Sequence, residues 1–149
     1  ENNVVDAQIS LLTKMGHEIM IFSNSTSEEQ KRKFFQIRSA SNVIFGIGDN
    51  PEKSLGKFEP DIILMHNLFP NLSTRWLENY GQITYSFKHN YRDICASANF
   101  YRNGSLCLKC VDENSLNSIK LKCYKKSSIK TAPLAIRNSL KIDYRFDLI

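Results

Sequence analysis

An unbroken apolar run at residues 62–65, inside the segment "PDIILMHN", constrains the fold of this chain more than any other feature of the sequence. Pro60 ends the element before the run, and a polar His-Asn pair follows it. Neighbouring side chains of a strand point to opposite faces of the sheet, so an unbroken apolar run belongs to a strand that is covered on both faces. The run therefore predicts a buried strand in a parallel sheet.

Helical and strand patterns alternate on both sides of this run. In the first of them, Val5, Ile9 and Leu12 predict one buried helical face. The patterns predict helices over residues 3–15, 28–39 and 74–80, and a helical or irregular piece over about 51–58. They also predict strands over 17–23 and 82–89, and a strand or an extended connection over 43–47. Alternation at this short spacing is typical of βαβ units. A chain of 149 residues fits one domain. We therefore predict a single α/β domain with a parallel sheet and flanking helices.

The order of the predicted elements begins with a helix and not with a strand. A doubly wound domain normally opens with a central strand, and the turn after that strand holds phosphate at a helix N-terminus. We therefore expect that the chain is a fragment, or that its first strand lies upstream of residue 1.

Polar residues follow two of the predicted parallel strands. His66 and Asn67 end one strand, and His89 and Asn90 end another. Ligands of open α/β sheets bind outside the carboxyl ends of the strands, and two such ends face one crevice. A neutral imidazole offers one donor and one acceptor, and an amide offers both, which suits the binding of several hydroxyl groups. The alternative is that these residues only form turns or caps. We interpret them as a binding site.

The cysteines of the chain all lie in one short segment, a loop at about residues 95–123. They are Cys95, Cys107, Cys110 and Cys123. The Cys-x-x-Cys pair in this set is a common half-site for zinc, and four thiolates would close a structural tetrahedral site. Two disulfides or reduced, buried thiols are the alternatives. The sequence leaves these three states open.

The net charge of +5 resides in the C-terminal third, because lysine and arginine outnumber acidic residues there. In the segment "IKLKCYKKSSIKTAPLAIRNSLKIDYRF", apolar residues such as Leu134 and Ile136 alternate with basic ones such as Lys125. This segment is either an amphipathic helix on anionic lipid or a core-packing helix with a basic outer face. Clustered aromatic side chains for base stacking do not accompany the charge, so we do not expect a nucleic-acid partner.

Three segments in order resemble a known family: "ENNVVDAQISLLTKMGHEI", "PDIILMHNLFPNLS" and "HNYRDIC…YRNGSLCLKC…KCYKKS". Together they resemble the N-terminal domain of retaining glycosyltransferases of the GT-B fold. More narrowly, they are similar to bacterial family 4 enzymes that build surface polysaccharides. The resemblance covers about residues 1–140, and its specific part is the block 60–127.

The resemblance implies a fold, an activity and partners. The chain would be the Rossmann-like, acceptor-binding half of a GT-B enzyme, without its first strand and without the C-terminal domain that binds the nucleotide-sugar donor. The enzyme would transfer a sugar from that donor to a saccharide or lipid-linked acceptor without a catalytic metal, and zinc would be structural only. We expect a cytoplasmic location, with peripheral contact at the inner membrane face. The isolated piece is not expected to catalyse transfer.

The resemblance also implies roles for the residues at the strand ends. His89 matches the family's histidine that meets the donor sugar or the reacting centre, so it is the expected catalytic residue. Asn90 and Tyr91 flank it. His66 and Asn67 match the family's other His-Asn pair, on the acceptor side.

The resemblance also bears on two charged residues. Arg92 meets a phosphate of donor or acceptor, or else forms an ion pair with a nearby carboxylate. Glu1 matches the glutamate that follows a Gly-Gly loop near the donor diphosphate, but the glycines themselves are not in this sequence. Where the family often has proline after the first cysteine, this chain has Ala96.

Two other functions compete with this interpretation. The first is a zinc-stabilised binding module whose basic face docks on a membrane surface or a polyanion. The second is a nucleotide-binding regulatory domain, which would require a glycine-rich phosphate loop that residues 1–149 do not contain.

Overall fold

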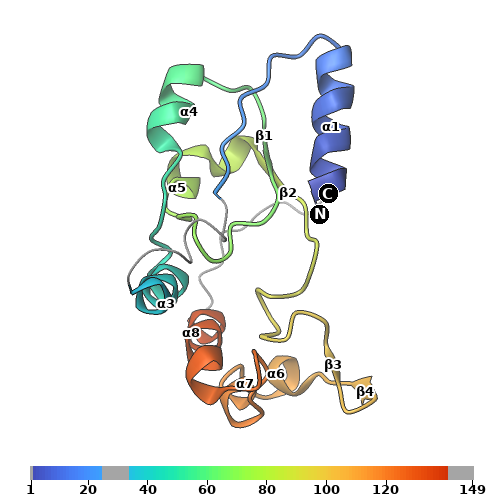
Figure 1. Ribbon diagram of the computed structural model, residues 1–149, viewed down its shortest axis with the longest axis vertical. Coiled ribbons are helices and arrows are strands. Elements are labelled where there is room, and N and C mark those ends of the chain that lie inside the picture. The colour runs from blue at the N-terminus through green and yellow to red at the C-terminus, as the bar shows by residue number, and fades with distance from the viewer. Residues whose placement is uncertain (1, 25–33, 141–149) are drawn as a thin grey trace.

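A computed structural model describes residues 2–24 and 34–140 of the chain. The described elements form two lobes, one above the other in Figure 1. The sheet lobe comprises α1 (Asn2–Lys14), α4 (Glu52–Phe58), β1 (Ile63–Met65), α5 (Leu77–Tyr80), the 3₁₀ helix η1 (Gly81–Ile83) and β2 (Thr84–Ser86). The helical lobe comprises α3 (Phe35–Phe45), β3 (Tyr101–Arg102), β4 (Ser105–Leu106), α6 (Lys109–Asp112), α7 (Asn117–Lys120) and α8 (Ser128–Ser139).

The strands β1 and β2 pair in parallel, with Ile63 opposite Thr84 and Met65 opposite Ser86. The strands predicted at 62–65 and 82–89 are therefore confirmed in position and in parallel pairing, although each is shorter than its pattern. The expected cover on both faces of the first strand is wrong, because Ile62 and Leu64 are exposed and only Met65 is buried. Helix and strand are mixed as an α/β chain requires, and the sheet that contains these strands has two strands among the described residues. The antiparallel pair β3–β4 forms a separate hairpin in the helical lobe.

The predicted strand at 17–23 is wrong. The described residues of this segment form neither helix nor strand, although Met20 packs against the core of the sheet lobe. The segment runs back along the lobe from the end of α1 (Figure 1). Ile19 and Met20 thus obtain partial burial without strand pairing, whereas Ile21 and Phe22 are exposed. An apolar pattern alone cannot distinguish such partial burial from strand pairing.

The predicted strand or extended connection at 43–47 is also wrong. Val43 is the buried residue near the end of helix α3, and Gly46 ends that helix with a left-handed φ of 61°. A short apolar run fits a buried helical turn as well as a strand, so its periodicity could not decide between them. The predicted helix 28–39 overlaps α3, and its first residues lie outside the described part of the chain.

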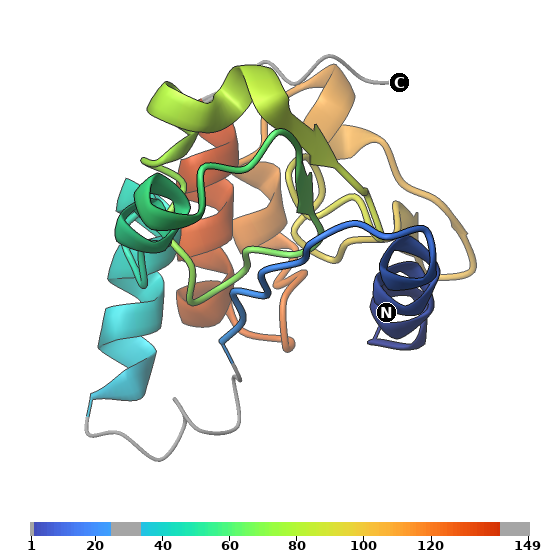
Figure 2. The same ribbon diagram turned by 90° about the horizontal axis from the view of Figure 1, so that it is seen from above.

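Helix α1 confirms the helix predicted at 3–15, but its apolar face is only half-buried. Val5, Ile9 and Leu12 are partly covered, whereas Leu11 and Met15 are exposed. The helix stands at the side of the sheet lobe, to one side of β1 and β2 in Figure 2. The piece predicted as helical or irregular at 51–58 is the helix α4, and the helix predicted at 74–80 corresponds to the shorter α5.

Each lobe has its own apolar core. In the sheet lobe, the buried residues are Leu55, Met65, Trp76 and Leu77, and Leu68 and Tyr80 pack against them. In the helical lobe they are Val43, Ala96 and Leu134, with Phe69, Cys123 and Tyr124 around them. A hydrogen bond from Trp76 Nε1 to the carbonyl oxygen of Ser73, 2.8 Å long, satisfies the indole inside the first core.

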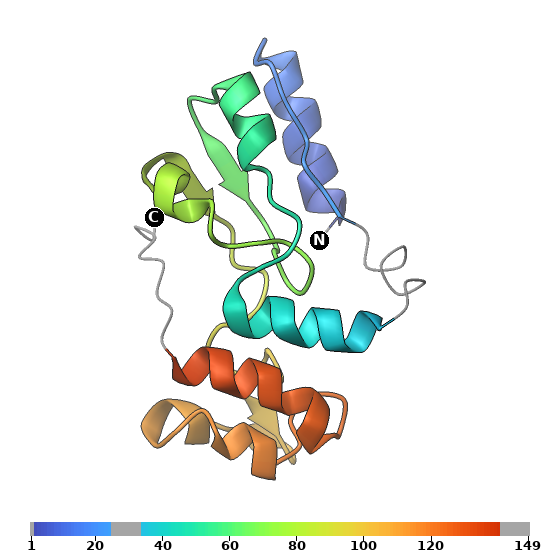
Figure 3. The same cartoon turned by 90° about the vertical axis from the view of Figure 1, so that its left-hand side faces the viewer.

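Helix α8 lies between α3 and α7, as Figure 3 shows for its stack with α3. It buries Thr131, Leu134 and Ala135. The core-packing interpretation of this basic helix is therefore confirmed. Ser127 caps its first turn, because the Ser127 hydroxyl accepts a hydrogen bond from the backbone N–H of Lys130. Across residues 2–24 and 34–140, the helices lack the length and apolar character that a membrane span needs.

Two loop segments, 46–49 and 71–74, run side by side. The N–H of Asp49 donates to the carbonyl oxygen of Asn71 (3.0 Å), and the N–H of Ser73 donates to that of Asp49 (2.9 Å). Gly48 has a φ of 153°, and a Cβ built on it would lie 2.2 Å from the carbonyl oxygen of Asn71. The close approach of the two backbones therefore requires glycine at this position.

Candidate functional site

The two predicted strand exits meet in space. His66 follows β1 and His89 follows β2, and their rings lie side by side with centroids 5.1 Å apart. His66 Nδ1 is 2.8 Å from His89 Nε2, so one imidazole donates a hydrogen bond to the other. The ring of Phe87 stacks on the other side of His66 at 4.9 Å. Parallel pairing of β1 and β2 produces this meeting, because it places both carboxyl ends at one edge of the sheet.

Each histidine is followed by an asparagine that shapes a turn. The Asn67 side-chain oxygen accepts a hydrogen bond from the backbone N–H of Phe69, and the Asn90 side-chain oxygen accepts one from Arg92, both at 3.0 Å. These are Asx turns, so the turn interpretation of the two asparagines holds for their oxygen atoms. Their amide nitrogens have no such bond in the described part of the chain and are available to a ligand.

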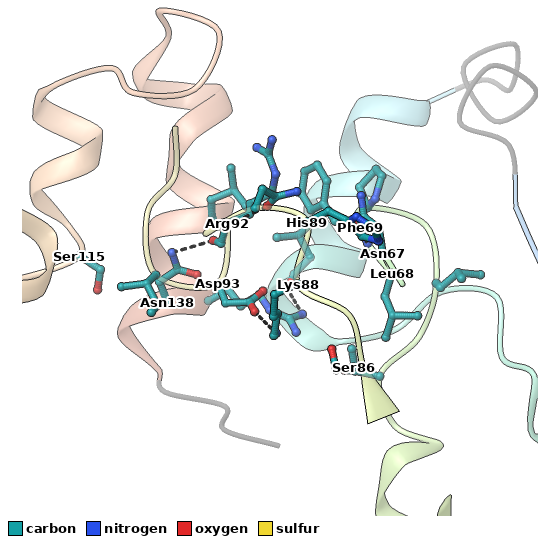
Figure 4. A pocket seen from close by; sticks show the side chains of 18 of the residues that line it. Asn67, Leu68, Phe69, Ser86, Lys88, His89, Arg92, Asp93, Ser115 and Asn138 are labelled. Atoms are coloured by element: carbon teal, nitrogen blue, oxygen red, sulfur yellow. Dashed lines mark hydrogen bonds and ion pairs between the residues drawn. The ribbon is translucent and has the colours of Figure 1, made fainter. Parts of the chain in front are cut away.

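The exits border a cavity of about 640 Å³ between the two lobes. His66, Asn67, His89 and Asn90 line it from the sheet side, and α8 lines it from the helical lobe. Figure 4 shows Asn138 of α8 turned toward the loop that carries His89. The Asn138 amide nitrogen donates to the carbonyl oxygen of Arg92 at 3.2 Å, which fixes this loop against the helix.

Arg92 lies in this wall between two aromatic rings. Its guanidinium carbon is 4.8 Å from the centroid of Phe69 and 5.3 Å from that of Tyr124. One terminal nitrogen, Nη1, is buried and has no hydrogen-bond partner among the described residues. The expected alternative of an ion pair with a carboxylate is not found for Arg92 within residues 2–24 and 34–140. The ring contacts hold a positive charge at the cavity wall without neutralising it.

An ion pair lies beside the histidines, between Lys88 and Asp93 (Figure 4). Both side chains are exposed, so the pair contributes little stability. It spans the turn that carries His89 and therefore favours one position of that turn.

Two expected site residues have different surroundings. Tyr91 does not line the cavity; it is exposed, and its ring contacts that of Phe100 with centroids 4.9 Å apart. Glu1 lies outside the described residues.

The sequence pattern did not point to the side chains that α8 brings to the cavity, Arg137 and Asn138. Arg137 also donates to the carbonyl oxygen of Val43 in α3 at 3.1 Å. The available signal was helical spacing, since residues three and four positions after the buried Leu134 lie on a neighbouring face of the helix. Lys88 and Asp93 could have been predicted from the sequence, because Lys88 directly precedes His89 and Asp93 follows it by four residues.

The four cysteines lie in the helical lobe, away from the histidines, and together they line a second cavity of about 300 Å³. Their thiols are free; Cys95 is buried and the other three are half-buried. Among the described residues, no three His, Cys, Asp or Glu side chains already stand close enough to hold a metal ion. Cys110 also lines the larger cavity, so the two cavities are neighbours.

The surroundings of the thiols differ. Burial raises the pKa of Cys95, but hydrogen bonds from the Ser97 hydroxyl and from nearby backbone groups outweigh it and lower the pKa below the ordinary value. Burial raises the pKa of Cys110, and the neighbouring Cys123 adds to the rise. Burial also raises the pKa of Cys123, although the Arg102 guanidinium partly offsets this effect.

The larger cavity thus combines a hydrogen-bonded imidazole pair, two amides and a cation held by aromatic rings. Such a set can orient hydroxyl groups and accept negative charge. No family model, curated protein or solved structure that was compared with this chain matches it.

Proposed function

We propose that this chain is the acceptor-binding domain of a glycosyltransferase that transfers a sugar from a nucleotide-sugar to a saccharide or lipid-linked acceptor. The observation that carries the proposal is the His66–His89 pair, which stands at the carboxyl ends of two neighbouring parallel strands on the wall of a cavity. The sequence resemblance supports the same class. The cavity, at about 640 Å³, has the size of a small-molecule site and can take a sugar unit with part of its neighbour.

The chemistry of the cavity wall suits a sugar. Because His66 holds Nε2 of His89, the orientation of the His89 ring is fixed, and its Nδ1 has no bonded partner among the described residues. That nitrogen can bind a hydroxyl group, and the amides of Asn67 and Asn90 can bind others. Glycosyl transfer with retention depends on oriented hydroxyl groups and on stabilisation of a departing diphosphate more than on a strong base.

Arg92 can supply the second of these, the stabilisation of the departing diphosphate. Its guanidinium keeps a buried nitrogen at the cavity wall that has no hydrogen-bond partner among the described residues, and the rings of Phe69 and Tyr124 restrict its movement. A planar cation with free donors is suited to phosphate oxygens. In this proposal, Arg92 meets a phosphate of the donor or of a lipid-linked acceptor.

The alternative function, a zinc-stabilised module that docks on a membrane through the basic helix, has less support. Helix α8 turns Leu134 and Ala135 into the interior and leaves only scattered apolar residues such as Ile129 exposed. A docking helix needs a continuous apolar face toward the lipid.

The test is a binding titration of the purified chain, followed by backbone amide NMR, with octyl β-D-glucoside, N-acetylglucosamine and UDP-glucose as ligands. We expect at least one of the saccharides to shift amides near His66 and His89. His89→Ala should weaken that binding about tenfold, because a hydrogen bond to the ligand and the partner of His66 are both lost.

The matched control is His17→Ala. His17 is the third histidine of the chain, and it is exposed and outside the cavity. Its removal should leave the affinity unchanged. Equal affinities for the two variants, or saccharide shifts confined to residues outside the cavity, would contradict the proposal.

A further inference from the structure

The segment that carries the cysteines has almost no core of its own. Between residues 97 and 122, Ser118 is the only buried residue. Tyr101, Leu106 and Val111 are exposed to 57%, 70% and 53%. The strands of this segment contain two residues each and its helices four. Elements this short are not stable in water without tertiary support, so something other than apolar burial must hold the segment in its fold.

The cysteines are placed where such support would act. They come from separate points of the segment, namely the loop after β2, the end of the β3–β4 hairpin, helix α6 and the connection after α7, and all four line the same cavity of about 300 Å³. Small units with little core are commonly held by disulfides or by a structural metal. A cross-link at this cavity would join every element of the segment at once.

The spacing of the central pair favours a metal over disulfides. Cys107 directly follows β4, and Cys110 lies in the first turn of α6, so one tight strand-to-helix turn presents both sulfurs to the cavity. The N–H of Cys107 donates to the carbonyl oxygen of Phe100 at 2.7 Å, which fixes the start of this turn. Two cysteines separated by two residues are a usual half-site for zinc. A disulfide between them would close so short a loop that it would stabilise the fold little.

The charges around the cavity fit a metal bound by thiolates. Zinc with four thiolates has a net negative charge, and the cavity is lined by the basic residues Arg102, Lys122 and Lys126. Arg102 Nη1 donates to the carbonyl oxygen of Leu121 at 2.7 Å and lies 4.0 Å from Cys123 Sγ. It therefore stands as an outer partner that can donate to a metal-bound sulfur.

We propose that Cys95, Cys107, Cys110 and Cys123 bind one structural zinc ion that holds residues 95–123 in their fold. Since no three of these side chains stand close enough to hold a metal among the described residues, the sulfur atoms must draw together to reach the zinc–sulfur distance of about 2.3 Å. All four positions of the metal are filled by protein, so the zinc takes no part in sugar transfer. Zinc binding is independent of the proposed function, since it is measured without any sugar.

The test is the metal content of the chain, expressed in zinc-containing medium and purified under reducing conditions without chelator. We expect about one equivalent of zinc per chain. Replacement by cobalt should give intense visible bands and thiolate-to-cobalt charge transfer, which tetrahedral sulfur coordination produces. Cys110→Ser should lower the zinc content at least about fivefold and weaken the charge-transfer band.

Val111→Ser is the matched control, because Val111 is the exposed neighbour of Cys110 in the same helix. It should keep both the zinc and the cobalt spectrum. Less than about a tenth of an equivalent of zinc in the unmodified chain would overturn the proposal. An intact mass showing two disulfides in non-reduced protein without zinc would also overturn it, as would equal loss of zinc in the two variants.

Discussion

At the scale of single residues, hydroxyl groups are the most deeply buried polar features of the helical lobe. Thr131 and Ser118 are the largest side chains that are fully buried among the described residues. The Thr131 hydroxyl donates to the carbonyl oxygen of Ser127 at 2.6 Å and accepts from the N–H of Tyr124 at 3.0 Å. The Ser118 hydroxyl donates to the carbonyl oxygen of Ser115 at 2.7 Å. Side-chain hydrogen bonds to the backbone therefore fix the start of α8 where apolar packing is sparse.

Thr131→Val tests this role with little change in shape. The variant leaves the N–H of Tyr124 buried without an acceptor, so we expect the free energy of unfolding to fall by about 1–3 kcal/mol. Urea denaturation measures the change. Thr13→Val is the control, because the Thr13 hydroxyl bonds to Ile9 on exposed α1, and its loss should cost less than about 0.5 kcal/mol. Equal losses in the two variants would contradict the role of Thr131.

At the scale of elements, the loops 46–49 and 71–74 join α3 to α5. Their backbones are bonded to one another, and the Ser73 hydroxyl donates to the carbonyl oxygen of Gly46 at 2.9 Å. The first loop links α3 to α4, and the second leads from β1 to α5. This contact therefore sets the position of the sheet lobe relative to α3, and so the width of the cavity between the lobes.

Gly48→Ala should disrupt this contact. The added Cβ would meet the carbonyl oxygen of Asn71 at 2.2 Å in a backbone conformation that alanine rarely adopts. We expect the free energy of unfolding to fall by at least about 2 kcal/mol. Gly81→Ala is the control, since Gly81 has helical φ and ψ angles and no atom within 4 Å of a built Cβ. Thermal denaturation compares the two, and a Gly48→Ala protein as stable as Gly81→Ala would contradict the close approach.

At the scale of the whole molecule, two lobes with separate cores enclose the cavity. The sheet lobe centres on Leu55 and Trp76, and the helical lobe on Val43 and Leu134. The helices that pack most closely, α3, α7 and α8, all belong to the helical lobe. Among the described elements, no helix or strand of one lobe packs as closely on an element of the other lobe, and the cavity lies at this boundary.

Cavity-creating substitutions test the independence of the two cores. Leu55→Ala and Leu134→Ala should each cost about 2–5 kcal/mol. Hydrogen exchange followed by mass spectrometry should show the faster exchange mainly in the lobe that carries the substitution, because each lobe can open locally. A uniform rise over both lobes from either variant would show one cooperative unit.

Much of the local structure could be predicted from the sequence, and most of the long-range structure could not. The apolar run 62–65 predicted β1, and parallel pairing of the next strand placed His66 beside His89. These inferences rest on periodicity and on a general property of parallel sheets. The side chains of α8 that reach the cavity, and the division into two lobes, depend on contacts between distant parts of the chain. No local pattern carries that information.

The two lobes are interleaved along the chain, and this limits how the molecule can be divided. Helix α3 belongs to the helical lobe but lies between α1 and α4 of the sheet lobe in sequence, and the chain returns to the helical lobe only after β2. No single cut between the described elements yields two pieces that each contain one complete lobe. Neither lobe can therefore be transferred as a contiguous cassette, so chimaeras of this region must exchange both lobes together with the cavity between them.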